Sequence, residues 1–301
     1  MKFKYSIIIP HYNSEVSLNI LLSSIPNDDL LEVLVIDDRS STAEYRQVIE
    51  SSSLANIKEF SNKGVKGAGS CRNIGVEKAT GQYLIFADSD DYFTTNAFEN
   101  INAAVDEIDE QIDILFFQVT SSDSRNKLGF RHIKNSVLVT NYINKTGKYY
   151  KEKIRLTHNV PWGKVFRAEF VRNNNIKFDE TIIANDGMFS LKAGKLSKDI
   201  ACSNKEIYCV TQSENSLTTT KNVNHYRVRL EVYTRYYNYL SRKERKHIEA
   251  SPFPLLYLSF DYGVVEVVRS IIYLKKNRVS IFKNFKFSFE RLKRFTSRLS
   301  K

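Results

Sequence analysis

Residues 67–91 read GAGSCRNIGVEKATGQYLIFADSDD, and this stretch decides the fold. Its first part predicts a helix that is closed by Gly81. The apolar run QYLIFA, residues 82–87, predicts a strand. Three carboxylates in four residues follow that strand at once: Asp88, Asp90 and Asp91. Because like charges this close repel one another, a positive group is expected beside them.

The segments before this stretch alternate between strand and helix patterns. SEVSLNILLSSI, residues 14–25, has helical apolar spacing, and Ser14 suits its N-cap. Apolar runs predict strands at YSIIIP (5–10), EVLVID (32–37), NIKEF (56–60) and IDILFFQV (112–119). The alternation predicts an α/β domain with a mainly parallel sheet. Such sheets bind ligands beyond the carboxyl ends of their strands, where Asp37, Asp38 and residues 88–91 fall.

The second half gives weaker patterns. Residues 121–155 are polar and are expected to be irregular. PWGKVFRAEFVRNNN, residues 161–175, predicts a helix with Pro161 in its first turn, and DGMFSLKAGKL, residues 186–196, predicts another. After about Thr220 the chain turns helical, aromatic and basic. We therefore expect one domain over residues 1–218 and a helical extension over residues 219–301.

The composition of the 301 residues excludes several classes of protein. Hydrophobic residues make up 42% and charged residues 26%, which predicts a packed soluble core. No apolar run is long enough to span a bilayer, and the first residues do not fit a signal peptide. Three cysteines without paired spacing indicate neither a disulfide framework nor a zinc site, so we expect a reducing cytoplasm.

The net charge of +11 is concentrated at one end of the chain. From Lys275 to the last residue there are ten Lys and Arg against Glu290 alone. The remaining body is nearly neutral, which argues against a nucleic-acid-binding core and for a basic attachment at the end.

The Asp-x-Asp spacing at a strand end has a direct chemical meaning. Carboxylates placed in this way can hold a hard divalent cation, Mg²⁺ or Mn²⁺, which takes its other ligands from water and substrate phosphates. The cation would neutralise the cluster and link it to a diphosphate. The alternative is a solvated acidic turn that caps the next helix.

Five blocks in this order resemble family 2 glycosyltransferases with the GT-A fold: SIIIPHYN, LVIDDRS, residues 67–91, PWGKVFRAEFVRNNNIKFDETIIANDGMF and SENSLT. The resemblance covers roughly residues 4–220. It implies a Rossmann-like mixed sheet flanked by helices. It also implies a donor-binding half at about 1–118 and an acceptor half at about 119–218.

The resemblance implies roles on the donor side. Pro10 and Tyr12 would line the nucleotide base, and Asp38 would accept a hydrogen bond from the imide of uracil or thymine. Arg72 would lie near the donor phosphates or brace the carboxylates. Asp88 would face the ribose and the metal, Asp90 would ligate the metal, and Ser89 and Lys164 are counted with the donor-binding residues. The alternatives are a turn-former at Asp38, surface positions for Arg72 and Lys164, and a helix cap at Asp91.

The resemblance also implies the base of an inverting sugar transfer. The family supplies it from the Asp of a Glu-Asp pair at a helix start, which here reads Asn185-Asp186. Asp186 would be that base; the alternative is an ordinary helix N-cap. This sequence departs from the family at Asn185, where the neighbouring acid is missing. Asn185 and Trp162 would contact the acceptor, unless Trp162 fills the core.

The basic tail has a pattern of its own. In residues 280–301, apolar residues recur at three- and four-residue spacing among lysines and arginines. This pattern is typical of a helix on an anionic membrane surface. The alternative is that the phenylalanines pack on the catalytic domain. Together with the enzyme interpretation, the membrane interpretation of the tail predicts a cytoplasmic protein that is peripheral at the inner face of the cell membrane.

The sequence thus predicts an inverting, Mn²⁺- or Mg²⁺-dependent glycosyltransferase. Its donor would be a nucleoside-diphosphate sugar, in the first place a UDP-sugar. Its acceptor would be a glycan or lipid-linked glycan in lipopolysaccharide, capsule or other surface-polysaccharide synthesis. Two alternatives stay open: a sugar-phosphate nucleotidyltransferase, and a non-catalytic nucleotide- or glycan-binding protein.

Overall fold

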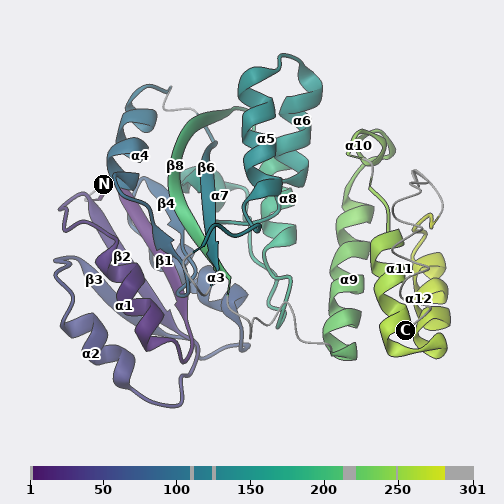
Figure 1. Ribbon diagram of the computed structural model, residues 1–301, viewed down its shortest axis with the longest axis horizontal. Coiled ribbons are helices and arrows are strands. Elements are labelled where there is room, and N and C mark those ends of the chain that lie inside the picture. The colour runs from purple at the N-terminus through teal and green to yellow at the C-terminus, as the bar shows by residue number, and fades with distance from the viewer. Residues whose placement is uncertain (1–2, 109–111, 124–126, 213–221, 249, 282–301) are drawn as a thin grey trace. The chain divides into compact units, whose positions relative to one another are not determined.

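A computed structural model describes residues 3–108, 112–123, 127–212, 222–248 and 250–281. The chain divides into two compact units, residues 1–221 and 222–301 (Figure 1). None of the helices in the described ranges has the length and apolar character needed to cross a membrane. The predicted tail helix at 280–301 lies almost wholly outside the described residues, as does the SENSLT block at 213–218.

Strands of the described part of unit 1 form one mixed sheet in the order β3-β2-β1-β4-β7-β6-β8-β5. The first four are parallel, β7 is antiparallel to both of its neighbours, β6 and β8 are parallel, and β5 is antiparallel to β8. The bounds are β1 Tyr5–His11, β2 Leu31–Asp37, β3 Ile57–Ser61, β4 Tyr83–Phe86, β5 Tyr92–Phe93, β6 Ile114–Asp123, β7 Lys164–Arg167 and β8 Ile200–Gln212.

Helices cover both faces of this sheet, and that explains why β1 is apolar at successive positions. Ile7 and Ile9 pack into a core shared with α1 and α4, whereas Ile8 packs into a second core shared with α3, α7 and α8. Neighbouring side chains of a strand point to opposite faces, so a sheet covered on both sides needs apolar residues throughout. The helices are α1 Glu15–Ser23, α2 Glu44–Glu50, α3 Ala68–Lys78, α4 Ala97–Asp106, α5 Ile133–Asn144, α6 Lys148–Thr157, α7 Ala168–Asn173 and α8 Gly187–Leu196.

Two predictions for the second half are wrong. Residues 121–155 are not irregular, because they contain α5 and α6, which pack on each other and on the second core. Residues 161–175 are not one helix either. Pro161 precedes the strand β7, and only the part from Ala168 to Asn173 is helical. Residues 164–167, KVFR, pair between β4 and β6, so tertiary pairing overrides their local helical pattern.

Unit 2 is built from helices: α9 Val223–Tyr239, α10 Arg242–His247, α11 Phe253–Ser259, a 3₁₀ turn at Phe260–Tyr262 and α12 Val264–Lys276. Among its described residues, Tyr226, Leu230, Leu256 and Leu274 are members of one buried cluster. The first part of the segment that was expected to be helical after Thr220 forms two helices, α9 and α10, because Ser241 and Glu244 form a capping box that begins α10.

Candidate active site

The parallel strands β1, β2 and β4 end at one edge of the sheet, and the predicted site residues follow those ends. Asp38 comes directly after β2, and its backbone N–H donates to the carbonyl of His11 at the end of β1 (2.8 Å). Its buried carboxylate accepts a hydrogen bond from Asn62 Nδ2 (2.7 Å). Asn62 is in turn fixed by Gly64 and Val65. Asp38 is therefore held by a structured turn after β3.

Tyr12 also follows β1, and its ring is 46% exposed while Pro10 is buried. The ammonium group of Lys66 lies 3.7 Å from the centre of the Tyr12 ring, a cation–π contact. One face of this ring is thus already covered by a cation. A base that stacks on Tyr12 would use the other face or displace Lys66.

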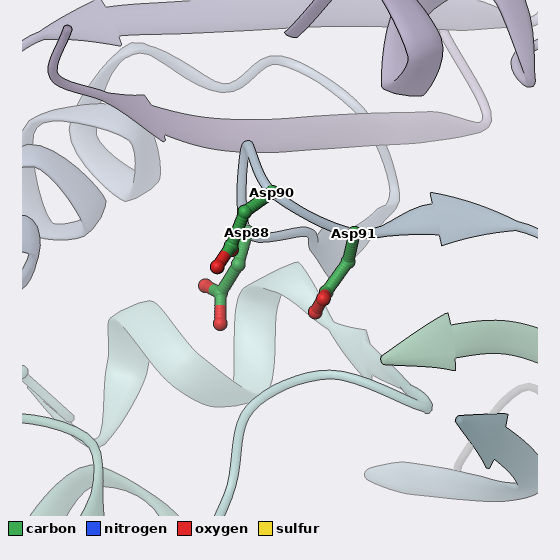
Figure 2. Close-up of side chains that lie close together, drawn as sticks. All are labelled: Asp88, Asp90 and Asp91. Carbon is green, nitrogen blue, oxygen red and sulfur yellow. The ribbon is translucent and has the colours of Figure 1, made fainter. Parts of the chain in front are cut away.

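The acidic cluster lies on the turn between β4 and β5 (Figure 2). Each of Asp88, Asp90 and Asp91 offers a carboxylate oxygen, and these oxygens lie within 4.8 Å of one another. Asp90 is exposed and Asp88 is partly exposed, whereas Asp91 is only 2% exposed. Partial desolvation and the nearby Asp88 charge raise the pKa of Asp90. The repulsion expected from the sequence is therefore present in the structure.

Asp91 has a structural partner. Its Oδ1 accepts a hydrogen bond from the backbone N–H of Thr211 on β8 (2.8 Å). Burial and the charges of Asp90 and Asp88 raise its pKa well above the ordinary value. Tyr208, also on β8 and buried, accepts the backbone N–H of Asp88 through its hydroxyl (2.8 Å). Asp91 thus ties the acidic turn to β8 and is a poorer metal ligand than the other two.

Arg72 is the positive group that the sequence predicted beside the cluster. It comes from α3, is 5% exposed, and pairs through Nη2 with Asp88. Its Nη1 donates to Asn185 Oδ1 at 2.8 Å. Burial lowers its pKa, but the charges of Asp88 and Asp186 outweigh that effect and raise it. The surface alternative for Arg72 is wrong.

Asn185 lies where the family has Glu, and the structure gives it a definite contact. It is 9% exposed, and besides accepting from Arg72 it donates to the carbonyl of Thr181 (3.4 Å). The approach of α3 to this loop requires Gly69, because a Cβ there would meet the carbonyl oxygen of Asp179 at 2.0 Å. In this structure Asn185 orients Arg72.

Asp186 occupies the N-cap position of α8, but its side chain accepts no hydrogen bond from that helix. Its role as an ordinary cap is therefore not supported. Burial raises the pKa of Asp186, the Arg72 charge lowers it and the Asp88 charge raises it, with a net increase. A raised pKa makes this carboxylate a stronger base than a free aspartate.

Lys164 does not lie on a solvated face. It is 1% exposed, and its Nζ donates to the backbone carbonyl of His158 (2.7 Å) beside the rings of Phe116 and Phe166. Burial lowers the pKa of Lys164 to about 7, while the charge of Asp186 opposes this shift. The charge of Lys164 in turn lowers the pKa of Asp186, and this is how Lys164 affects the site.

Trp162 fills the core. It is 6% exposed and stacks on Tyr208, with ring centres 6.2 Å apart, so it offers little surface to an acceptor sugar. Gly163 follows with a φ of 68°, a left-handed conformation that glycine adopts most easily and asparagine next. That conformation turns the chain from Trp162 into β7.

Ser14 and Ser89 contact each other between β1 and the acidic turn. Ser14 precedes α1, but its side chain caps no helix N–H and instead contacts His11 Nδ1 (3.0 Å) and Ser89 Oγ (2.9 Å). The cap prediction is therefore wrong, because the hydroxyl is used to join β1 to the acidic turn. Ser89 serves this contact in the structure.

The site suits a divalent cation in the chemistry of its donors. Asp90 and Asp88 offer hard carboxylate oxygens, and desolvation followed by the charge of Asp88 raises the pKa of Asp90. Oxygen ligands of this kind are those that Mg²⁺ and Mn²⁺ prefer. Both ions therefore fit the residues present.

Known proteins of similar sequence include glycosyltransferases. The family model for glycosyl transferase family 2 matches residues 6–175, more than half of the chain. The poly(ribitol-phosphate) β-N-acetylglucosaminyltransferase TarS of Staphylococcus aureus is 29% identical over 223 residues, which are 70% of this chain and 36% of TarS. An Escherichia coli protein, the UDP-Glc:α-D-GlcNAc-diphosphoundecaprenol β-1,3-glucosyltransferase WfgD, is 38% identical over 96 residues, 31% of this chain and 38% of WfgD. The matched region thus covers little more than a third of the length of either protein.

Solved structures support the predicted fold class. The crystal structure of S. aureus TarS 1–349 in complex with UDP-GlcNAc superposes with a TM-score of 0.68 at 22% identity, covering 91% of this chain and 81% of that one. The mannosyltransferase PcManGT of Pyrobaculum calidifontis, in complex with GDP-Man and Mn²⁺, gives a TM-score of 0.53 at 13% identity, covering 100% and 80%. At these identities the agreement concerns the fold, and it confirms the mixed α/β architecture with C-terminal helices.

Proposed function

Because the chain belongs to glycosyl transferase family 2, we propose that it moves a sugar from a UDP-sugar to a hydroxyl of a glycan or lipid-linked glycan acceptor, with inversion at the anomeric carbon. The acceptor would belong to a bacterial surface polymer. The names of TarS and WfgD, which describe transfer to poly(ribitol-phosphate) and to a diphosphoundecaprenol-linked sugar, support this class of acceptor.

One observation carries the proposal. Arg72 is bonded at one nitrogen to Asp88 and at another to Asn185, the neighbour of Asp186. A single buried side chain therefore links the acidic turn, where a donor diphosphate would bind, to the start of α8, where an acceptor hydroxyl would lose its proton. Inverting transfer needs these two functions on opposite sides of one sugar.

On the donor side, Asp38 offers its carboxylate to a uracil imide and Tyr12 offers its exposed ring for stacking. Asn62 holds the Asp38 carboxylate in place. Asp90 and Asp88 would hold a Mn²⁺ or Mg²⁺ ion, which supplies Lewis-acid stabilisation of the departing diphosphate. The charge of Arg72 adds to the positive field at the same place.

On the acceptor side, the Asp186 carboxylate takes the hydroxyl proton as the acceptor oxygen attacks the anomeric carbon. The bond from that carbon to the diphosphate breaks, and its electron pair leaves with the diphosphate. The raised pKa of Asp186 strengthens it as a base, and the charges of Arg72 and Lys164 oppose that increase.

The proposal is tested by measuring UDP-sugar turnover with Mn²⁺ in the wild type, Asp186→Asn and Asp199→Asn. Asp199 lies just after the C-terminal end of α8, and its exposed side chain forms an ion pair with Lys151 at 3.6 Å, so it is a matched control. Loss of a general base lowers kcat about 10²–10⁴-fold. We expect that loss for Asp186→Asn, unchanged donor binding, and normal activity for Asp199→Asn.

Two results would contradict the proposal. If the wild type and Asp186→Asn both bind UDP-sugars and neither turns them over, the chain is the non-catalytic binding protein. If Asp186→Asn stays fully active, the base lies elsewhere. A sugar-phosphate nucleotidyltransferase would instead release pyrophosphate from a nucleoside triphosphate and a sugar phosphate.

A further inference from the structure

Helix α12, Val264–Lys276, exposes the side that is expected to be buried. Val264, Val265, Val268 and Ile272 are 75%, 65%, 50% and 59% exposed. On its buried side lie Glu266, 5% exposed, and Ser270, 1% exposed. A surface helix normally turns its apolar stripe to the core and its polar side chains to water. We call the four exposed apolar residues the valine face.

The buried side of α12 is fixed by polar bonds. Glu266 accepts two hydrogen bonds from Arg227 of α9, at 3.0 and 2.6 Å. Ser270 Oγ lies 2.7 Å from the hydroxyl of Tyr226, and Leu274 packs in the core of the unit. Rotating the helix to bury the valine face would leave Glu266 without its partner, at a high cost for a buried charge. The exposure is therefore a built feature of unit 2.

The surroundings of the valine face are cationic. Lys275 and Lys276 are exposed at its C-terminal end, and Arg269 is exposed beside it. Residues 222–301 contain 18 Lys and Arg against 6 Asp and Glu, a net charge of +12. Residues 1–221 contain 27 against 28, a net charge of −1. The net positive charge of the protein thus comes from residues 222–301.

We propose that the valine face binds the surface of an anionic lipid bilayer, with its apolar side chains inserted between headgroups. An apolar helical face with a cationic margin is what such a surface binds. Net charge favours anionic lipid over two other possible partners, a second copy of unit 2 and the end of this chain. A second copy of unit 2 has the same net charge of +12, and residues 282–301 of this chain have seven Lys and Arg against one Glu. Like net charge disfavours both as partners, whereas anionic lipid is attracted. The inference does not depend on the proposed function.

The test is co-sedimentation of the full chain with vesicles of phosphatidylglycerol and phosphatidylcholine, compared with phosphatidylcholine alone. Val268→Gln with Ile272→Gln removes half of the valine face without changing charge or lowering helix propensity. Val16→Gln with Ile20→Gln on α1 is the matched control, because these residues are also four apart and are 80% and 53% exposed. A second pair, Val264→Gln with Val265→Gln, repeats the test at the other end of the face.

We expect the wild type to bind only the anionic vesicles, each α12 pair to weaken binding about tenfold or more, and the α1 pair to bind normally. Circular dichroism checks that each variant is folded. Failure of the wild type to bind overturns the inference, and so does equal binding by the α12 pairs, since the tail alone would then suffice. A concentration-dependent dimer that Val268→Gln with Ile272→Gln abolishes, without lipid binding, would identify a second copy as the partner.

Discussion

Arg72 makes two bonds with its guanidinium group. Its two terminal nitrogens contact different residues, Asp88 and Asn185, and the planar guanidinium holds those contacts in fixed relation. A lysine has one compact ammonium group and would reach one partner only. Charge is kept by that substitution, so it isolates the geometry.

We predict that Arg72→Lys lowers kcat/KM about a hundredfold, the range seen when one preorganised donor is lost from an active site. The matched control is Arg167→Lys, because Arg167 pairs with the buried Asp113 (2.5 Å) at the opposite end of β4. Both variants should lose stability, which thermal unfolding measures. Only Arg72→Lys should lose activity; equal losses in both would mean that Arg72 is merely structural.

Lys164 is a buried amine whose pKa is lowered to about 7. In the unfolded chain a lysine keeps its proton to a pKa of about 10.4. Between these values the unfolded state binds one proton more than the folded state, so stability must rise with pH in that window. Below pH 7 both states are protonated and this contribution stays at its lowest.

We predict that the free energy of unfolding of the wild type gains about 1.4 kcal/mol per pH unit above pH 7 relative to Lys164→Met. Urea unfolding at several pH values up to 9 measures it, and comparison of the two proteins cancels the other titrating groups. Lys198→Met, at an exposed lysine after α8, should keep the wild-type slope. A parallel pair of curves for the wild type and Lys164→Met would show that the amine is charged when folded.

The acidic residues of the site could be predicted from the sequence, but their partners could not. Asp88 and Asp90 end a recognisable strand, so their place follows from local pattern. Tyr208, which accepts the N–H of Asp88, lies 120 positions later on a strand that the pattern did not reveal. Asn62, His158 and Lys66 were also missed, although the turn sequence Asn62-Lys63-Gly64 is a usable signal for Asn62.

At the scale of elements, the contact between α3 and the loop 179–185 brings Arg72 to the base. Gly69 allows this contact, since a Cβ there would come within 2.0 Å of the Asp179 carbonyl and 3.0 Å of Asn185 Cβ. Gly187, next to Asp186, has no atom within 4 Å of such a Cβ. The two glycines therefore offer the same substitution with opposite steric results.

We predict that Gly69→Ala destabilises unit 1 by about 1–3 kcal/mol, the usual cost of overpacking, and abolishes most activity because α3 moves away from the loop. Gly187→Ala should be neutral or stabilise by up to about 1 kcal/mol and keep activity. Thermal unfolding and UDP-sugar turnover measure both effects. Normal activity in Gly69→Ala would mean that the loop shifts without affecting the base.

Elements with a clear apolar pattern in the sequence were predicted, whereas elements that depend on pairing with distant strands were not. The parallel strands β1, β2 and β4 are buried on both faces, so their apolar runs stand out in the sequence. β7 lies between β4 and β6 and has only four residues, too few to show a period. In β8, residues 203–206 are polar and partly exposed, which hides the strand among turn-like residues. Similarly, α5 and α6 carry many polar residues outside their buried stripes.

At the scale of the whole molecule, charge and core divide in the same way. Unit 1 has a net charge of −1 and two apolar cores around the sheet, and unit 2 has a net charge of +12 and a helical core of its own. The residues proposed for catalysis all lie in unit 1, and the valine face lies in unit 2. Chemistry and attachment would thus be assigned to separate cores.

This division predicts how ligand changes unfolding. Trp162 is the only tryptophan and is buried in unit 1, so its fluorescence reports unit 1, whereas helical ellipticity also reports unit 2. UDP with Mn²⁺ at a hundred times the dissociation constant should stabilise unit 1 by about 2.7 kcal/mol and raise the fluorescence transition by several degrees. The ellipticity transition of unit 2 should keep its midpoint temperature, whether it lies above or below that of unit 1.

The controls for this prediction separate metal from nucleotide. Asp90→Asn, or chelation of Mn²⁺, should remove most of the shift, because Asp90 is the exposed carboxylate of the acidic turn. Asp106→Asn, at an exposed carboxylate at the end of α4, should keep it. An equal shift of both transitions would mean that the two units unfold together. An unchanged shift in Asp90→Asn would mean that nucleotide binds without a cation at Asp90, since the carboxylate that ligates the ion would then be dispensable.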